Sequence, residues 1–139
     1  MIRVLIPENA EFSRYENEIK NLYKNSQAQI NDPNSFEFIR DNTFFYMFLD
    51  DDKLIGGIYY FVDEAGKLFL NGFANRKMFE QSLECLKLST SWFDSDIYAE
   101  AQNRASALCL LRCGFRRFND NIFILKVKSS AKKVYSSFF

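Results

Sequence analysis

The stretch from Asp96 to Phe115, DIYAEAQNRASALCLLRCGF, constrains the fold of this chain most strongly. Its first part, Ile97 to Ala101, alternates larger apolar side chains with others, which predicts a short strand. Asn103 is a good helix N-cap, and Gly114 suits the left-handed residue that ends a helix. We therefore predict a strand, a capped helix and a second strand beginning at Phe115, together forming one compact βαβ-like unit.

The predicted helix between these caps has little polar surface, so we expect it to be largely buried. Arg112 lies in its last turn, where a cation suits the negative end of the helix dipole. The apolar residues of this helix are Ala105, Ala107, Leu108, Cys109, Leu110 and Leu111.

The first part of the chain predicts one strand and two helices. The strand is Ile2–Ile6, and apolar residues at spacings of three and four predict a helix from Glu11 to Lys24. A polar stretch, Asn25–Asn31, separates it from a short second helix. For that helix Asp32 is the predicted N-cap and Pro33 the first residue.

Three strands with short connections follow and predict an antiparallel meander. The first is a continuous apolar run, FFYMFL, which predicts a strand covered on both faces. Gly56 and Gly57 inside the second strand indicate a bulge or a close backbone approach. A long amphipathic helix, Met78–Phe93, precedes the central stretch, and a hairpin turned at Asp120–Asn121 follows it. The strands of the meander and the hairpin are Phe44–Leu49, Leu54–Val62, Leu68–Ala74, Phe115–Phe118 and Ile122–Val127.

Asn103, the small Ser106 and the pair Gly114–Phe115 resemble the C-terminal motif of the GNAT superfamily, the acetyl-CoA-dependent N-acetyltransferases. The predicted element order, β-α-α-β-β-β-α-β-α-β-β, is also the GNAT order. The glycine pair at 56–57 is similar to one that GNAT proteins commonly carry in the corresponding strand. The resemblance implies one α/β (α+β) domain, residues 1–128, with a C-terminal tail at 129–139. Its mixed, mostly antiparallel sheet would have about seven strands, flanked by about four helices.

The resemblance implies acetyl-CoA as cosubstrate and places its pantetheine arm. Asn103 would face this arm, and the helix that follows would flank the cofactor groove. The third strand of the meander would splay away from its neighbour. The backbone of Gly72, Phe73 and Ala74 would then pair with the pantetheine amides like an added strand.

The phosphate-binding loop of the family departs from its usual pattern here. The corresponding stretch runs from Asn75 to Gln81. With Arg76 as the family's first position, Phe79 and Gln81 stand where glycines are expected. Their side chains would crowd the phosphates, which the family holds with backbone N–H groups. Arg76 and Lys77 could contact phosphate through their side chains instead, or they could be two solvated cations at a strand–helix turn.

The family's usual general acid, a tyrosine seven residues after the motif asparagine, is replaced by Leu110, which cannot deliver a proton. Glu100 is the best candidate for a general base, because a partly buried carboxylate could have a raised pKa. Tyr98 shares its face of the strand, and either side chain could line the groove. Two alternatives stay open: Glu100 lies simply on the solvent face, or Asn71 and Asn75 order a water that serves as the base.

Composition excludes several other chemistries. The chain has no histidine, which removes Ser-His and Cys-His pairs and most zinc sites, so we predict no metal. Lys plus Arg and Asp plus Glu number 18 each, so we predict binding neither to nucleic acid nor to a membrane surface. No apolar run approaches the ~20 residues of a spanning helix. Three cysteines without a secretion signal predict reduced thiols and a cytoplasmic protein. The 16 Phe and 7 Tyr predict a core dense in aromatic rings.

Two functions from different classes follow from these residues. One is transfer of an acetyl group from acetyl-CoA to a small-molecule or peptide amine, by direct attack of the amine on the thioester. The other is a GNAT-fold binding or assembly component without transferase activity. Degenerate GNAT-like proteins encoded by bacteriophages look similar in their weak phosphate loop. We rank the enzyme first, because GNAT catalysts vary widely in base and acid. The acceptor and the oligomeric state stay open, a homodimer included.

Overall fold

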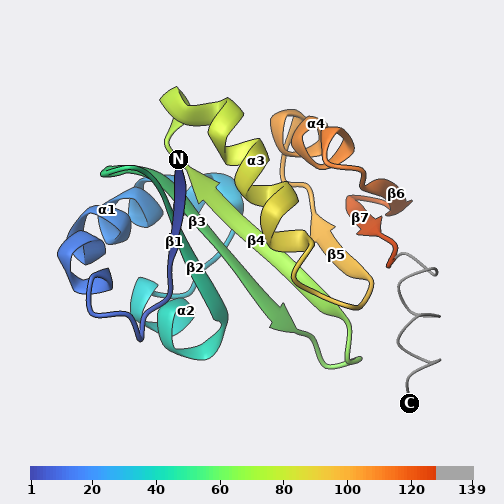
Figure 1. Ribbon diagram of the computed structural model, residues 1–139. Helices are drawn as coiled ribbons and strands as arrows, with labels where there is room; N and C mark the ends of the chain where they lie inside the picture. The colour runs from blue at the N-terminus through green and yellow to red at the C-terminus, as the bar shows by residue number, and fades with distance from the viewer. Residues whose placement is uncertain (128–139) are drawn as a thin grey trace, which may run out of the picture.

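One sheet of seven strands runs through residues 1–127, the part of the chain that this computed structural model describes (Figure 1). The strand order is β1-β2-β3-β4-β5-β7-β6, and every neighbouring pair is antiparallel except β4 and β5. The predicted tail, 129–139, lies outside the described residues. The strands are β1 (Ile2–Leu5), β2 (Phe44–Asp50), β3 (Lys53–Val62), β4 (Leu68–Ala74), β5 (Ile97–Glu100), β6 (Arg116–Asn119) and β7 (Ile122–Leu125).

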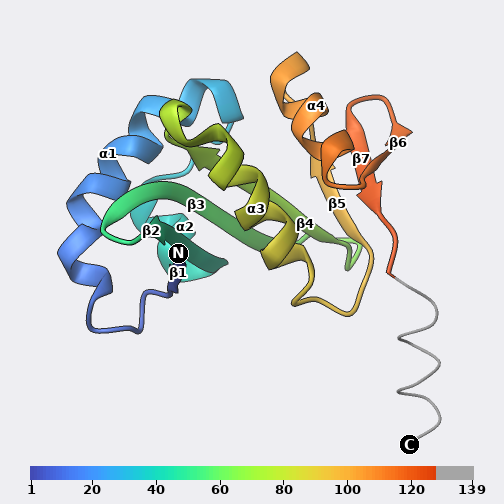
Figure 2. The ribbon, with the colours of Figure 1, turned by 45° about the horizontal axis from the view of Figure 1, so that its top comes forward.

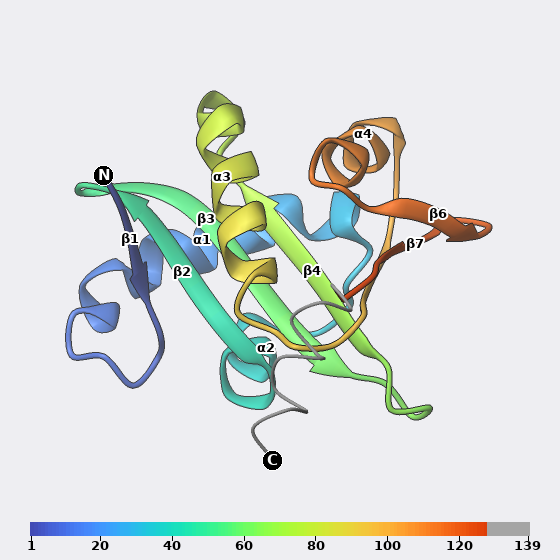
Figure 3. The same cartoon turned by 45° about the vertical axis from the view of Figure 1, so that its right-hand side comes forward.

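Four helices and one 3₁₀ turn accompany this sheet within the described residues. α1 and α2 pack on one face, and α3 and α4 on the other (Figure 3). The predicted α/β fold class, with about seven strands and about four helices, is confirmed. None of the helices in residues 1–127 is long and apolar enough to cross a membrane. Their bounds are α1 (Phe12–Ile30), α2 (Phe36–Asn42), the 3₁₀ turn η1 (Arg76–Met78), α3 (Phe79–Thr90) and α4 (Arg104–Arg112).

Each face of the sheet has its own apolar core. On the α1 and α2 face the core consists largely of aromatic rings, as the content of phenylalanine and tyrosine predicted. The rings of Tyr23 and Phe73 lie 5.3 Å apart between centroids, and those of Phe36 and Phe45 lie 5.7 Å apart. Such edge-to-face pairs hold α1 and α2 against the central strands.

α1 is longer than predicted, because it continues to Ile30 instead of ending at Lys24. The predicted polar separator, Asn25–Asn31, is therefore wrong. Its polar side chains are compatible with a helix because Ile30, on the inner side, packs against the core. Asn31 then ends the helix in the left-handed conformation, with φ 51°. The extra turns bring the end of α1 up to β4, where the carbonyl of Ile30 accepts the side-chain amide of Asn71 at 3.4 Å.

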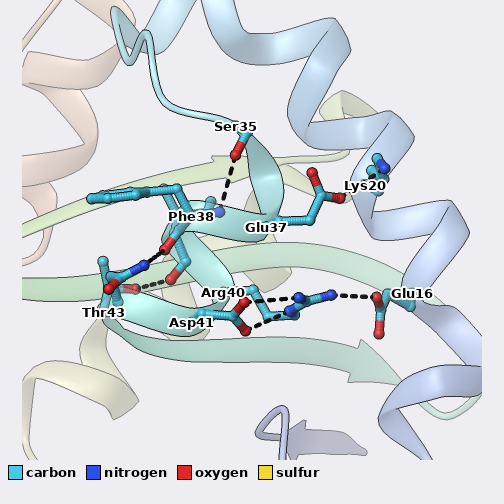
Figure 4. Close-up of polar contacts among 10 residues, drawn as sticks. Glu16, Lys20, Ser35, Glu37, Phe38, Arg40, Asp41 and Thr43 are labelled. Atoms are coloured by element: carbon cyan, nitrogen blue, oxygen red, sulfur yellow. Dashed lines mark hydrogen bonds and ion pairs between the residues drawn. The ribbon is translucent and has the colours of Figure 1, made fainter.

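α2 has Ser35 as its N-cap, not Asp32 as predicted. The Ser35 hydroxyl accepts the N–H of Phe38 at 3.1 Å (Figure 4). Asp32 is engaged elsewhere: one carboxylate oxygen accepts the N–H of Asn34 at 2.9 Å, and the other accepts the hydroxyl of Tyr59 at 2.6 Å. A residue held by a distant strand cannot also cap the helix, so α2 begins later.

Ion pairs tie α2 to α1 (Figure 4). Arg40 lies 2.7 Å from a carboxylate oxygen of Glu16, and Lys20 lies 2.7 Å from one of Glu37. Hydrogen bonds to Asp41 and then to Glu16 raise the pKa of Arg40. Because these side chains are partly exposed, each pair stabilises the fold only modestly. These ion pairs fix the position of α2 relative to α1 beside the sheet.

α4 is capped as predicted but is not largely buried. The side chain of Asn103 accepts a backbone N–H of the first turn at 2.9 Å, and Gly114 has φ +93°. Only Leu110 of this helix is buried, whereas Leu108 and Leu111 are 57% and 50% exposed. The short helix contacts the core from one side only, so the outer half of its apolar surface faces outward.

The strands on either side of α4 are not neighbours, so the predicted compact βαβ-like unit is wrong. β7 lies between β5 and β6 and is antiparallel to both. The hairpin turn at Asp120–Asn121 is confirmed, and it folds β7 back so that Leu125 pairs with Ile97. α3 is also shorter than predicted: it ends at Thr90, and its predicted first residue belongs to η1.

Candidate functional site

β4 and β5 separate partway along their length. They pair in parallel from Leu68↔Ile97 to Leu70↔Ala99, and among the described residues Asn71–Ala74 have no partner on β5. Figure 2 shows the two strands diverging toward the ends that lead into α3 and α4. The opening between them, which we call the splay, has an unpaired strand edge along one side.

The backbone groups of Gly72 and Ala74 point into the splay. On the opposite edge of β4, the N–H of Asn75 bonds to the carbonyl of Ile55 on β3 at 2.8 Å. The amides of successive strand residues point to alternate edges, so Phe73 faces β3 and its two neighbours face the splay. Three positions were predicted to pair with a pantetheine arm. Gly72 and Ala74 present their backbone groups to the splay, whereas those of Phe73 face β3.

The Gly72 N–H is already held by the residue before it. Asn71 Oδ1 accepts it at 2.8 Å, and Asn71 Nδ2 donates to the hydroxyl of Tyr59 at 3.0 Å. That hydroxyl donates in turn to Asp32 at 2.6 Å. Burial, followed by the bond to Asp32, raises the pKa of Tyr59, so the hydroxyl keeps its proton. Sequence reasoning considered Asn71 only for ordering water. Sequence reasoning missed this series of hydrogen bonds, because the residues that form it come from segments far apart in the sequence.

A cavity of about 180 Å³ opens at the splay. It extends between α3 and α4 on one face of the sheet, and Ile30 and Asn71 border it on the other. Its walls are mostly apolar, and Glu100 is the one charged residue among the described residues that line it. The helical walls are formed by Ser82, Leu83, Leu86, Ser106, Cys109 and Leu110.

The two predicted catalytic residues are in different environments. Glu100 lines the cavity, but its side chain is exposed and not partly buried as expected. Tyr98 is not one of the lining residues. Its ring packs against Phe69 and Phe118, with centroids 5.5 Å away in each case, and Lys67 lies over it at 5.0 Å. Of the pair, only Glu100 is therefore placed beside the opening.

The position of the family's general acid is apolar. Leu110 is buried in the cavity wall. Cys85 and Cys109 also line the cavity, but burial raises the pKa of the Cys85 thiol to about 12 and also raises the pKa of Cys109. Thiols that stay protonated are weak nucleophiles. Within residues 1–127 no cluster of His, Cys, Asp and Glu could hold a metal ion.

Asn103 lies at the start of α4 and acts as its cap. Its Oδ1 accepts both the N–H and the hydroxyl of Ser106, at 2.9 and 3.1 Å. Ser106 lines the cavity, whereas Asn103 is exposed. The motif asparagine therefore positions a residue of the cavity wall.

Side chains occupy the start of α3, where a phosphate loop needs bare backbone. Phe79 and Glu80 are its first two residues. The Arg112 guanidinium of α4 lies 5.7 Å from the Phe79 ring centroid and 3.6 Å from a carboxylate oxygen of Glu80. The glycines that normally let backbone N–H groups approach phosphate are missing, and an acidic group is present.

The preceding turn supplies cations. Asn75 Oδ1 accepts the N–H of Lys77 at 3.1 Å and so caps η1, and Arg76 and Lys77 are both exposed. The site therefore fits acetyl-CoA unequally along its length. The apolar cavity and the unpaired edge of β4 suit an acyl-pantetheine arm. At the phosphate end, the available groups are side-chain cations.

The prediction for Gly56 is confirmed. A Cβ at this position would lie 2.1 Å from the carbonyl oxygen of Phe73 on β4. The register of β2 with β3 also shifts between Phe48 and Leu49, opposite this glycine. The absent side chain lets β3 lie unusually close to β4 beside the splay.

A scan against models of protein families finds no match for this chain, and neither does a search of curated proteins. Solved structures of similar fold do match. An acetyltransferase of the GNAT family from Staphylococcus aureus Mu50 is 13% identical, with a TM-score of 0.57 over 92% of this chain and 100% of that one. The ribosomal-protein-S5-alanine acetyltransferase of Vibrio fischeri is 14% identical, with a TM-score of 0.61 over 91% of each chain.

A Bacillus subtilis acetyltransferase, solved in complex with CoA, is 12% identical, with a TM-score of 0.59 over 92% of this chain and 100% of that one. These matches extend over nearly the whole of both chains. The chain therefore has the fold of the GNAT acetyltransferases.

Proposed function

We propose that this chain is an N-acetyltransferase-like protein that transfers acetyl from acetyl-CoA to the amine of a small molecule or peptide. The observation that carries the proposal is the cavity at the splay. It has an unpaired strand edge at Gly72 and Ala74 and a single carboxylate, Glu100. The CoA complex of the B. subtilis structure supports the choice of cosubstrate, since its fold is the same.

In the proposed reaction the amine nitrogen attacks the thioester carbonyl carbon directly. Glu100, or a water that it holds, accepts the proton lost by the nitrogen. The carbon–sulfur bond breaks, and the sulfur gains a proton from water, because Leu110 has none to donate. The products are an amide and a free thiol. The Ala74 N–H, which faces the splay, would orient the carbonyl oxygen.

Different residues of the chain would bind different parts of acetyl-CoA. The edge of β4 would receive the pantetheine amides as an added strand does. Asn103 and the serine that it holds would border the arm at α4. Arg76 and Lys77 would meet the phosphates through their side chains, because backbone N–H groups at Phe79 are obstructed.

Two observations favour a second function, a GNAT-fold binding or assembly component without transferase activity. The start of α3 carries Glu80, which pairs with Arg112 across the place where phosphate would bind. Loss of the acid at Leu110 points the same way. Under this alternative the chain would be a catalytically degenerate GNAT-fold protein of the kind that bacteriophages encode.

We also propose a cytoplasmic location. The three cysteines Cys85, Cys109 and Cys113 are all free in the structure. Raised thiol pKa values make them slow to oxidise, and free thiols are typical of a reducing compartment.

Two measurements test the proposed function together. Acetyl-CoA at one hundred times its dissociation constant should stabilise the protein by ~2.7 kcal/mol, which is visible as a rise in melting temperature. A panel of primary amines should then be screened for release of the CoA thiol, with Glu100→Gln as the matched variant. Stabilisation without thiol release for any amine would select the binding component. An unchanged melting temperature at millimolar acetyl-CoA would exclude the transferase.

A further inference from the structure

The outer side of α4 carries a row of arginines and leucines. Arg104, Leu108, Leu111 and Arg112 are spaced as i, i+4, i+7 and i+8, which places them on one face of the helix. The leucines are 57% and 50% exposed, and both arginines are exposed as well. The two leucines lie one helical turn apart, so they form a small continuous apolar surface flanked by the arginines. We call these four residues the α4 stripe.

The segment that contains α4 is rich in arginine. From Gln102 to Asn119 the chain has four arginines and no aspartate or glutamate. Glu80 of α3 lies 3.6 Å from Arg112 and offsets part of its charge, and the other three arginines keep the segment basic. The surface is therefore suited to an anionic partner that also offers apolar contacts.

The α4 stripe and the cavity at the splay lie on opposite sides of one helix. Ser106, Cys109 and Leu110 line the cavity, and their positions on the helical wheel are opposite those of the stripe. A helix is only ~10 Å across, so a partner on the stripe lies within one helix diameter of the cavity. A flexible arm attached to such a partner would need to pass round only one helix.

We propose that the α4 stripe docks an acidic carrier protein that presents an acyl thioester on a phosphopantetheine arm. This inference rests on the proposed function, because it assigns a second donor of the same acyl-pantetheine group to the same cavity. The apolar cavity and the unpaired edge of β4 suit the arm, whereas Phe79 and Glu80 stand at the start of α3, where the diphosphate of CoA would lie. A carrier-borne arm has a single phosphate, and its protein supplies the remaining contacts at the stripe.

The stripe argues against other occupants. A two-fold contact between copies of this chain would place the arginines of one stripe against those of the other. Nucleic acid would use the arginines but would leave the two leucines without partners. A membrane surface is bound by a helix with a broad apolar face opposite its basic face, whereas the stripe places its arginines and its two leucines on the same face.

The chemistry of transfer is the same for both donors. The amine nitrogen forms a bond with the acyl carbon, and the bond from that carbon to the carrier's sulfur breaks. The proton lost by the nitrogen is balanced by one gained at the sulfur. The carrier then leaves with a free thiol on its arm.

Titration calorimetry with three donors tests the inference. The probes are acetyl-pantetheine, acetyl-CoA and a bacterial acyl carrier protein loaded with an acetyl group. We expect the loaded carrier to bind at least tenfold more tightly than acetyl-pantetheine. The double variant Arg104→Glu with Leu108→Gln should lose at least tenfold in carrier affinity and keep its affinity for acetyl-pantetheine within twofold. Lys24→Glu, an exposed charge reversal on α1, is the matched control and should bind the carrier like the parent.

The outcomes separate the two proposals. If acetyl-pantetheine and acetyl-CoA both fail to bind, the proposed function is wrong. If they bind and the carrier gains nothing over acetyl-pantetheine, only the carrier inference is wrong. Equal carrier binding by parent and double variant would also overturn it. The same holds if the stripe binds single-stranded oligonucleotides or anionic vesicles and not the carrier.

Discussion

Asn71 Oδ1 lies 2.8 Å from the backbone nitrogen of Gly72, at the edge of β4 where this strand parts from β5. The Gly72 N–H is one of the donors that we propose to pair with the pantetheine amides, as in the addition of a strand. Tyr59 and Asp32 hold the Asn71 side chain in place from behind. The free protein therefore satisfies this donor by itself, and a ligand must compete for it.

We expect Asn71→Ala to strengthen acetyl-CoA binding about 2–10-fold, because a competing neutral hydrogen bond is worth roughly 0.5–1.5 kcal/mol. The free energy of unfolding should fall by about 1 kcal/mol, because Tyr59 loses one of its partners. Calorimetric titration and urea denaturation measure the two effects. Asn21→Ala, at an exposed position of α1, is the control. Weaker binding by Asn71→Ala would show that Asn71 helps the ligand and does not compete with it.

Asn103 combines a structural and a proposed binding role, and two substitutions separate them. Asn103→Ala should lower the free energy of unfolding by about 1 kcal/mol through loss of the N-cap, whereas Asn103→Ser should keep most of the cap. If the asparagine also faces the pantetheine arm, both variants should bind acetyl-CoA more weakly than the parent. Full affinity in Asn103→Ser would reduce this residue to a cap. Thermal denaturation with and without ligand gives both quantities.

Arg76 and Lys77 are proposed to hold phosphate through their side chains. Charge-assisted hydrogen bonds are worth roughly 1.5–3 kcal/mol each, so the double alanine variant should bind CoA at least tenfold more weakly. Binding of acetyl-pantetheine, which has no phosphate, should hardly change. Stability should also change little, because exposed cations at a helix start contribute nothing favourable. Unchanged CoA affinity would identify the pair as a solvated turn.

Three buried tyrosines should make the fold sensitive to high pH. Burial is the first cause that raises the pKa of Tyr23, Tyr59 and Tyr60, to about 12 for Tyr23. Unfolded tyrosines ionise near pH 10, so this contribution to stability is fully present below about pH 10. It is lost as the pH rises through the higher pKa values of the folded state. Urea midpoints from pH 8 to 12 should therefore decline, and more gently in Tyr59→Phe. Parallel curves for parent and variant would contradict this assignment.

The elements whose ends are set by adjacent residues in the sequence were predicted well. β4 matches its predicted range, Leu68–Ala74, because turn residues precede it and a helix start follows it. The cap at Asn103 and the left-handed stop at Gly114 also needed only local information. The two misplaced helix limits, at Lys24 and Asp32, depend on contacts with strands more than twenty residues away, which no local pattern contains.

Several of the residues proposed for the site lie beside the cavity, and one does not. The positions from Gly72 to Ala74 line the cavity, as does Glu100. Strand alternation placed Tyr98 and Glu100 on the same face of β5. It could not show where β4 and β5 separate, and therefore which of the two side chains lies beside the cavity. Position along the splay, and not the face alone, decides which side chain reaches the cavity.

The sequence by itself determined the order of strands and helices, the caps of α4 and the absence of histidine from the whole chain. These follow from periodicity, turn chemistry and composition, which act over a few residues. Only the tertiary structure decided that Asn71 occupies the Gly72 N–H and that the leucines of α4 face outward. Both depend on how far one strand parts from the next and on which side of a helix the core lies. Packing among segments far apart in the chain sets both the separation of the strands and the buried side of the helix, so no local sequence pattern could predict them.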